Sequence, residues 1–252
     1  TVFVAHGDGV WTQQILDAVK PQVDHIVAVS HRVREAVCGD FPTTVIHNGI
    51  DPAHLTQSRS REIVRDSLGF GPEDFVLGFI GRFSPEKNPT ALVEAVARLP
   101  RPFKLMLIGF GVQRFELLDQ TVRRIPGRYA IAEAHEHMGD YYGAMDALCL
   151  PSVSEGYGLV LMEAMMCGCP VISAPVGFAP ETIKDRINGL IVEGTPEGFA
   201  EAARLLRDHP EWRTALALEG QRLAQRYGLP TRMAAKFADL LEQLCRTAHP
   251  VH

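Results

Sequence analysis

The chain has 252 residues, enough for one large domain or two modest ones with a substantial core. Its hydrophobic fraction of 46% and charged fraction of 22% are ordinary for a globular protein. The formal net charge of −5 argues against a nucleic-acid partner, because phosphate binding requires a basic surface. No apolar run reaches the length that spans a bilayer, and no signal peptide is evident.

The cysteines have the spacing of neither a disulfide framework nor a zinc site. They are Cys38, Cys149, Cys167, Cys169 and Cys245. An odd number without regular spacing favours a reducing compartment, so we expect a cytoplasmic protein. Cys167 and Cys169 are too close together for the usual zinc pair, and we interpret both as structural and expect no metal. The chain begins at Thr1, within an apolar run, which suggests a fragment.

In chain order, short apolar runs alternate with helix-compatible segments. The runs that suit buried strands lie at 1–5, 25–29, 43–46, 75–80, 103–108, 128–132, 147–150, 171–173 and 189–192. Helices are expected at 11–20, 32–38, 62–68, around 92–96, before 123, and at 138–145, 196–207, 211–226 and 230–245. Strands that alternate with helices predict an α/β fold with a doubly wound parallel sheet.

Three polar residues are expected to begin helices. Ser30 has the side chain of a good N-cap, and Asp51 and Asn88 are each followed by a proline, which favours the first helical position. These signals predict helix starts near residues 31, 52 and 89.

The segment 151–170 combines a strand end, a loop with two glycines and a helix that is apolar on every side except at Glu163. A helix that is apolar all round is buried, and a lone buried carboxylate requires a partner. Glu163 therefore either meets a distant residue or binds the hydroxyl groups of a ligand. Glu155, the helix start near Gly158 and the room left by Gly156 favour a ligand, but a buried ion pair explains these local features equally well.

Two cations are expected at the same edge of the sheet. Arg82 and Lys87 follow the strand at 75–80, and ligands of doubly wound sheets bind beyond the carboxyl ends of the strands. Two cations beside a helix N-terminus suit a diphosphate. The alternative is a solvated loop, which the shared placement with Glu155 and Glu163 disfavours.

Several motifs occur together and in order: 48–51 (NGID), 81–87 (GR…K), 146–152 (DALCLPS), 155–163 (Glu, seven residues, Glu) and 188–190 (NGL). On these motifs the chain resembles the retaining glycosyltransferases of the GT-B fold, in the large family four. The resemblance implies two Rossmann-like domains. It assigns 1–54 to the end of an N-terminal acceptor domain, 55–228 to the domain that binds the nucleotide-sugar donor, and 229–252 to a helix that crosses back.

The resemblance also implies roles. Arg82 and Lys87 would hold the diphosphate, Glu163 would accept the ribose hydroxyls, and Glu155 would contact the sugar. The expected catalytic residues are Glu155, Arg82, Lys87 and His6. The expected donor-binding residues are Gly81, Arg82, Lys87, Gly109, Glu155, Gly156, Tyr157, Gly158, Leu159, Val160 and Glu163. The loop at 132–137 would border the base. Tyr157 stands where the family has Phe or Tyr, which favours a packing role over a chemical one.

The implied reaction moves a sugar from a UDP- or GDP-sugar to an acceptor, with retention at the anomeric carbon and without a metal or other cofactor. The acceptor is an unidentified glycan, lipid or small molecule. Contact with the inner face of the membrane would come through the portion that precedes Thr1. The alternative is a non-catalytic nucleotide-sugar-binding module of a larger protein. A dehydrogenase is disfavoured, because the glycines at 109 and 111 lack the third glycine of the dinucleotide fingerprint.

Overall fold

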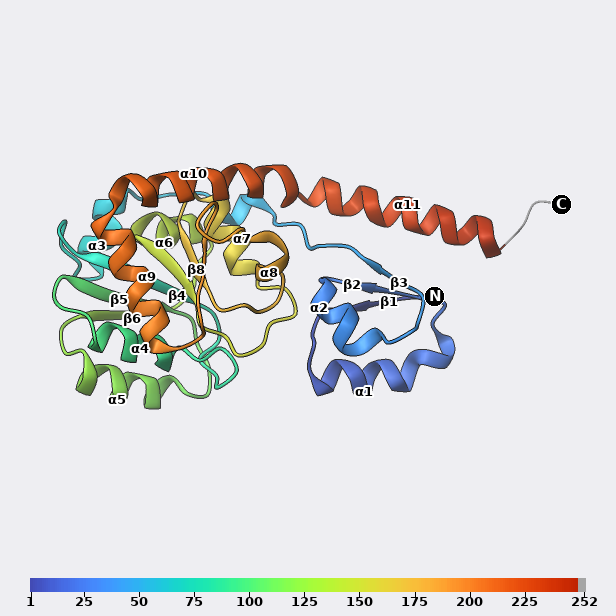
Figure 1. Ribbon diagram of the computed structural model, residues 1–252, viewed down its shortest axis with the longest axis horizontal. Coiled ribbons are helices and arrows are strands. Elements are labelled where there is room, and N and C mark those ends of the chain that lie inside the picture. Colours follow the sequence, from blue (N-terminus) through green and yellow to red (C-terminus); the bar gives the residue numbers. More distant parts are fainter. Residues whose placement is uncertain (249–252) are drawn as a thin grey trace.

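The structure, a computed structural model, describes residues 1–248, and the side chains of residues 1–246. Two parallel sheets lie side by side and are joined by two connections, with a long C-terminal helix running beside the smaller sheet (Figure 1). The expected C-terminal segment 229–252 is described as far as residue 248, and residues 249–252 lie outside the described part. Within that part, no helix is both long and apolar enough to cross a membrane.

The smaller sheet forms an N-terminal unit, residues 1–48. Its strands, all parallel and in the order β1-β2-β3, are β1 (Val2–Ala5), β2 (His25–Ala28) and β3 (Thr43–Val45). Its helical segments are α1 (Val10–Val19), η1 (Lys20–Gln22), α2 (His31–Val33) and η2 (Arg34–Cys38). The Ser30 side chain caps α2 by accepting a hydrogen bond from the Val33 backbone N–H at 3.1 Å, as predicted.

The larger unit, residues 51–228, is built on a six-stranded parallel sheet in the order β6-β5-β4-β7-β8-β9. The strands are β4 (Phe75–Ile80), β5 (Phe103–Ile108), β6 (Tyr129–Ala132), β7 (Ala147–Leu150), β8 (Val171–Ser173) and β9 (Leu190–Ile191). The chain therefore winds outward from β4 in one direction and from β7 in the other. The loops after β4 and β7 leave the same edge at this reversal, which is where doubly wound sheets bind ligands.

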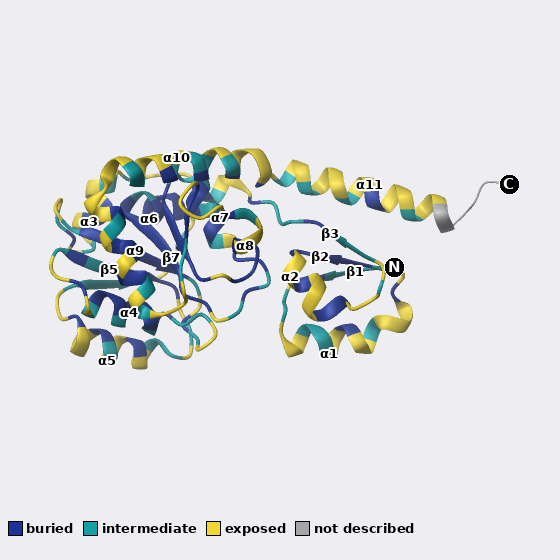
Figure 2. Ribbon diagram, in the orientation of Figure 1, coloured by how far each residue is buried: buried dark blue, intermediate teal, exposed yellow. Residues whose placement is uncertain are grey.

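Helices cover both faces of the larger sheet (Figures 1 and 2). On one face lie α4 (Thr90–Ala97), α5 (Arg114–Arg124) and α9 (Pro196–Asp208). On the other lie α3 (Arg61–Ser67), α6 (Met138–Ala144) and α7 (Leu159–Met166), with α10 (Pro210–Tyr227) beside α7. A hydrophobic core lies on each face of this sheet, and successive side chains of β4 point to opposite faces. Leu77 packs into the core beneath α4, α5 and α9, and Val76 packs into the core beneath α3, α6 and α7. Both are fully buried.

The two connections between the units touch each other. The outgoing chain passes Gly49 before η3 (Pro52–Leu55), and the returning chain enters α11 (Pro230–Ala248). The Ile50 backbone N–H donates to the Gly228 carbonyl at 2.7 Å. A Cβ on Gly49 would lie 2.5 Å from the Cα of Pro230, so only glycine permits this crossing.

Helix α11 packs against the N-terminal sheet. Its residue Leu240 is buried against Val27 and Ile46 of that sheet, with Phe237 and Met233 of the same helix beside it. The return helix expected from the sequence thus contacts the N-terminal unit. Figure 2 shows the opposite flank of α11 exposed.

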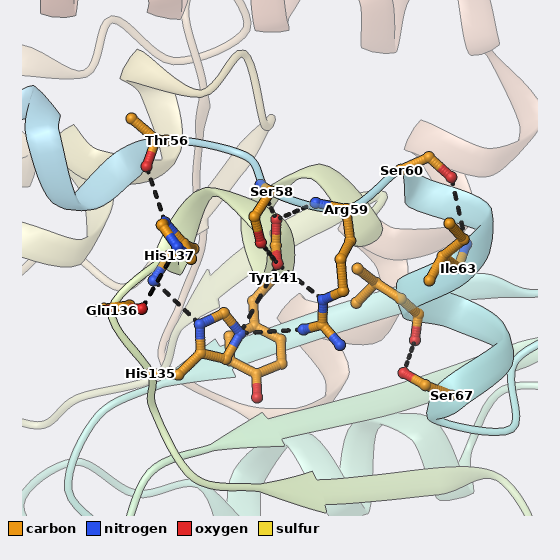
Figure 3. Close-up of polar contacts among 12 residues, drawn as sticks. Thr56, Ser58, Arg59, Ser60, Ile63, Ser67, His135, Glu136, His137 and Tyr141 are labelled. Atoms are coloured by element: carbon orange, nitrogen blue, oxygen red, sulfur yellow. Dashed lines mark hydrogen bonds and ion pairs between the residues drawn. The ribbon is translucent and has the colours of Figure 1, made fainter.

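The linker before α3 is anchored to α6 through Asp140, a residue that the sequence did not single out. Its two carboxylate oxygens accept hydrogen bonds from the backbone N–H groups and side chains of Ser58 and Arg59. Burial raises the pKa of Asp140, but these hydrogen bonds outweigh burial and hold the pKa well below its ordinary range. Figure 3 shows the neighbouring contact, in which Arg59 Nη2 lies 3.1 Å from His135 Nε2.

Most expected elements are present within a few residues of their expected bounds, but one predicted cap is wrong. Asn88 does not cap α4, whose N-cap is Pro89 with no side-chain hydrogen bond. Asn88 instead adopts a left-handed conformation with φ of 49°, and its side-chain amide donates to the Pro151 carbonyl at 3.4 Å. It thereby joins the loop after β4 to the loop after β7. The short helix α8 (Ala179–Thr182) was not expected.

Candidate active site

A cleft of about 790 Å³ opens between the two units at the carboxyl edge of the larger sheet. It is bounded by the loop after β1, the loop after β4 and the loop that leads from β7 into α7. The expected site residues among its lining are His6, Gly81, Arg82, Lys87, Glu155, Gly156, Tyr157, Gly158, Leu159 and Val160. The structure therefore brings ten of the expected positions to one cavity and leaves out Gly109 and Glu163.

Lys87 and Glu155 form the buried polar centre of the cleft. Lys87 Nζ lies 2.7 Å from Glu155 Oε2, and the other carboxylate oxygen accepts a hydrogen bond from Ser152 Oγ at 2.7 Å. The Lys87 side chain is 18% exposed and that of Glu155 is 10% exposed. Each charged group thus fixes the position of the other in a region with little water.

Arg82 stands in contrast, because its side chain is 64% exposed and reaches Glu86 only at 3.9 Å. An ion pair at that distance and exposure contributes little stability. The loop that carries Arg82 is nevertheless fixed, because the Val153 backbone N–H donates to the Glu86 carbonyl at 2.8 Å. The guanidinium is therefore free to meet an anion in the cleft while its backbone stays in place.

Helix α7 begins inside the cleft. Its N-cap, Gly158, has a φ of 91°, a left-handed conformation that favours glycine. In the described part of the chain, no side chain caps this helix. The N–H groups of Leu159 and Val160 belong to the first turn, where an α-helix has no internal acceptors and carries a partial positive charge.

Tyr157 forms a wall of the cleft. Its ring stacks on Phe178 with centroids 4.3 Å apart, and its hydroxyl donates to the Asn48 carbonyl at 3.3 Å. Burial raises the pKa of Tyr157 well above its ordinary value, with a smaller contribution from Glu181. The hydroxyl therefore stays protonated and donates a hydrogen bond to the N-terminal unit, and it does not act as a base.

The N-terminal unit closes the other side of the cleft through close contacts. Ser30 Oγ donates to the Gly156 carbonyl at 2.7 Å, and Ser154 Oγ donates to Asp8 Oδ1 at 2.5 Å. A Cβ on Gly156 would lie 1.9 Å from the carbonyl oxygen of His6, so a glycine is required here. His6 is exposed directly after β1 and lines the cleft, and its catalytic role stays a prediction.

Glu163 lies outside the lining of the cleft. Tyr142 donates its hydroxyl to Glu163 Oε2 at 2.6 Å, and His54 Nε2 lies 3.4 Å from Oε1. Of the two explanations left open by the sequence, the structure shows the distant partners. Burial raises the pKa of Tyr142 far above its ordinary value, and the Glu163 carboxylate raises it further. The ribose contact stays a prediction.

Gly109 also lies outside the lining, and its role is to support the loop that carries Arg82. A Cβ on Gly109, whose φ is 148°, would lie 1.9 Å from the carbonyl oxygen of Gly81. The Gly81 backbone N–H donates to the Ile108 carbonyl at 3.0 Å. A direct contact of Gly109 with a donor stays a prediction, as does the base contact of the loop at 132–137, which likewise lies outside the lining.

The comparison with known families is specific. Residues 60–222, more than half of the chain, match the family described as glycosyl transferases group 1. The chain belongs to this family. The matched span begins at the end of the linker and ends within α10, so it covers the whole of the larger sheet.

Curated relatives in this family are identical to the chain at about a third of the aligned residues. A D-inositol 3-phosphate glycosyltransferase of Rhodococcus opacus is 33% identical over 227 residues, which is 80% of this chain and 51% of that protein. A protein of the same name from Kineococcus radiotolerans is 30% identical over 241 residues, 86% of this chain and 55% of that protein. The chain spans about half the length of the curated relatives it matches.

Solved structures establish the fold. The crystal structure of Anabaena HepE in complex with UDP-glucose has a TM-score of 0.88, with 22% identity, and covers 96% of this chain and 72% of that chain. Sucrose-phosphate synthase from Thermosynechococcus elongatus has a TM-score of 0.84, with 24% identity, and covers 98% and 68%. The predicted Rossmann-like, doubly wound architecture is confirmed.

Several residues of the site were not found from the sequence. They are Asp8, Ser30, Ser152, Ser154 and Tyr142. Ser30 had been noted only as a helix cap, and Ser152 only as the last residue of the motif at 146–152. Asp8 stands between Gly7 and Gly9, in a segment that begins directly after His6. Glycines on both sides indicate a turn, and this signal could have drawn attention to Asp8. Tyr142 gave no signal, because its contact with Glu163 joins two helices that the sequence does not place side by side.

Proposed function

We propose that the protein transfers a sugar from a nucleotide diphosphate sugar to an acceptor, as the donor-binding part of a glycosyltransferase. The observation that carries the proposal is the joint placement of Arg82, Lys87 and the uncapped N-terminus of α7 around one cleft. Two cations and a helix N-terminus suit the two phosphates of such a donor. Family membership supports the same reaction class.

In this proposal the cleft assists departure of the nucleotide diphosphate. Negative charge grows on the distal phosphate as the bond to the sugar breaks. Lys87 and Arg82 stabilise that charge together with the N–H groups of Leu159 and Val160. Donors that are already in position need little reorganisation, and such electrostatic stabilisation is often the largest contribution to catalysis. We propose that these groups replace a metal ion, so that transfer continues in the presence of a chelator.

We further propose that transfer proceeds with retention and by attack on the same face that the nucleotide leaves. A double displacement requires a carboxylate nucleophile close to the anomeric carbon. The cleft has two nearly buried carboxylates, Asp8 and Glu155, and both oxygens of each are engaged by protein groups. Lys87 and Ser152 engage the oxygens of Glu155, which supports a role of this residue in holding Lys87 and binding sugar hydroxyls. The exposed His6 would contact the sugar from the opposite wall.

We propose UDP as the nucleotide, with GDP as the second choice, because the similar crystal structures are described as complexes with UDP, UDP and glucose, or UDP-glucose. The acceptor is unassigned. The names of the curated relatives point to an inositol phosphate for those proteins. We place the reaction in the cytoplasm, at the inner face of the membrane, and the free cysteines in the described part of the chain suit a reducing compartment.

The test is calorimetric titration with UDP-, GDP- and ADP-sugars. Arg82→Ala should weaken binding of the preferred donor roughly tenfold, because it removes a charge-assisted hydrogen bond to phosphate. Arg123→Ala is the matched control, since the Arg123 side chain is also exposed, at 74%, is paired with one carboxylate, Asp119, at 2.9 Å, and lies outside the lining of the cleft.

The proposal would be refuted if none of these nucleotide sugars bound to the protein. Binding that is equally strong in both variants would remove the role of Arg82. Binding by the complete polypeptide without release of the nucleotide diphosphate would indicate a non-catalytic nucleotide-sugar-binding module.

A further inference from the structure

A second cavity, the rear pocket, lies behind Tyr157. It has a volume of about 410 Å³, and Tyr157 lines both this pocket and the cleft. Its walls come from distant parts of the sequence: the chain after β3, the segment after α8, and the junction of α10 and α11. The residues used below are His47, Glu181, Lys184, Tyr227, Arg232 and Lys236. None of the expected site residues except Tyr157 belongs to it.

The rear pocket is cationic, although the whole chain has a net charge of −5. Three cations line it, namely Lys184, Arg232 and Lys236. In the described part of the chain, none of the three has a carboxylate oxygen within ion-pair distance. Arg232 lies over the ring of Tyr227, with its guanidinium carbon 4.8 Å from the ring centroid. These three positive charges are therefore not neutralised by the protein.

The single acidic residue of the lining does not balance them. Glu181 Oε2 lies 3.1 Å from His47 Nε2, and Oε1 accepts a hydrogen bond from the Arg32 backbone N–H at 3.2 Å. Both oxygens are thus turned toward the N-terminal unit. Burial lowers the pKa of His47, and Lys236 is close enough to lower it further against the opposing effect of Glu181.

Elsewhere on the same helix a cation is paired. Arg246, nearly three turns beyond Lys236, lies 3.4 Å from Glu242. The three unpaired cations of the rear pocket are exposed, and they reach the same cavity from α11 and from the segment after α8. Like charges that line one cavity repel each other, so the arrangement favours an anion that all three can meet.

We propose that the rear pocket binds a small anion with at least two negative charges, such as a diphosphate or a phosphate ester, separately from the donor cleft. The ammonium groups of Lys184 and Lys236 and the guanidinium of Arg232 would contact its oxygens. Lys184 belongs to the larger unit, whereas Arg232 and Lys236 belong to α11, which packs on the N-terminal sheet. The bound anion would therefore tie α11 to the larger unit. A change in the position of His47 on anion binding would reach Tyr157, whose ring centroid lies 5.8 Å from that of His47.

The test is calorimetric titration of the whole chain with inorganic pyrophosphate while UDP saturates the donor cleft. One pyrophosphate should bind. Lys236→Gln and Arg232→Gln should each weaken binding at least tenfold, the usual effect of losing one charge-assisted contact with phosphate. Arg246→Gln, which removes the same charge from the same helix, should leave binding unchanged.

Two outcomes would overturn the proposal: no pyrophosphate binding, or binding that Lys236→Gln and Arg232→Gln leave unchanged. UDP binding, measured first in each variant, reports both that the variant is folded and whether the donor cleft works, so failure of the proposed function is seen separately. If UDP does not bind, the same titration is made in the Arg82→Ala background.

A parallel sedimentation with vesicles of phosphatidylcholine and phosphatidic acid distinguishes a lipid headgroup from a free anion. Suppose that the protein binds the vesicles, that Lys236→Gln abolishes this binding, and that pyrophosphate does not bind. The ligand of the rear pocket would then be a membrane surface, and the proposal of a small anion would be refuted.

Discussion

Lys87 is held in position by groups that are themselves part of the cleft. Its ammonium is 2.7 Å from Glu155, and Ser152 fixes the other oxygen of that carboxylate. A lysine with a free four-carbon side chain loses much rotamer entropy when it binds a phosphate. Here the protein has already paid that cost, so the charge is available at the place where it is needed.

Replacement of Lys87 by alanine should lower the rate of transfer roughly 100-fold in the full-length enzyme, as loss of one donor to a developing charge does. The rate of release of the nucleotide diphosphate measures it. Lys104→Ala is the control, because Lys104 has nearly the same exposure, 17%, and is paired with Asp74 at the start of the strands. Equal rates for the two variants would exclude Lys87 from the chemistry.

Glu163 offers a second test at the same scale. A carboxylate has about four acceptor sites, so contacts with Tyr142 and His54 leave room for a ribose hydroxyl. We expect the protein to bind UDP about tenfold more tightly than 2′-deoxy-UDP, and Glu163→Gln to abolish this preference. Calorimetry with the two nucleotides measures it. If Glu163→Gln weakens both nucleotides equally, the residue serves only its protein contacts.

At the scale of elements, local signals were sufficient for the strands and most helices. The apolar run at 75–80 and the proline after Asp51 depend only on neighbours in the sequence, and both β4 and η3 formed as predicted. The cleft was also predictable, because the order of a doubly wound sheet brings the loops after β4 and β7 together.

Contacts between distant elements were not predictable. The composition of α7 required a partner for Glu163, but nothing in it identified a tyrosine on α6. Asn88 has the sequence context of a helix cap, and its actual role depends on a carbonyl 63 residues away. The same limit applies to the contact of Ser154 with Asp8, which forms only when the two units meet.

The loop before α7 depends on a close approach that one methyl group would prevent. Gly156→Ala would place a Cβ 1.9 Å from the His6 carbonyl oxygen. We expect it to break the Ser30 and Ser154 contacts and to destabilise the junction by about 1–3 kcal/mol, the usual cost of overpacking.

Faster backbone hydrogen exchange in the turn at 6–9 measures this effect. Gly71→Ala is the control, because the nearest atom to its added Cβ is 3.7 Å away. Unchanged exchange in Gly156→Ala would show that the loops can separate without cost.

At the scale of the whole molecule, the N-terminal unit has a small sheet of three strands, and α11 covers part of that sheet with apolar side chains. Leu240 is 7% exposed and its neighbour Leu241 is 47% exposed. We expect Leu240→Ala to destabilise the N-terminal unit by about 2–3 kcal/mol, because it leaves a cavity against Val27.

Hydrogen exchange followed strand by strand measures the effect, which should appear in β1–β3 and leave β4–β9 protected. Leu241→Ala should change neither sheet. Equal loss of protection in both sheets after Leu240→Ala would show that the two units unfold as one.

The contact between the two connections has a consequence for protein engineering. The Ile50 N–H and the Gly228 carbonyl are joined by one hydrogen bond of 2.7 Å, so the larger unit leaves and rejoins the rest of the chain at a single point. A segment whose ends lie together can be relinked or inserted elsewhere with little strain. Residues 51–228 could therefore replace the corresponding unit of a related transferase. The two cuts in the chain that this exchange requires would lie next to each other, at Ile50 and Gly228.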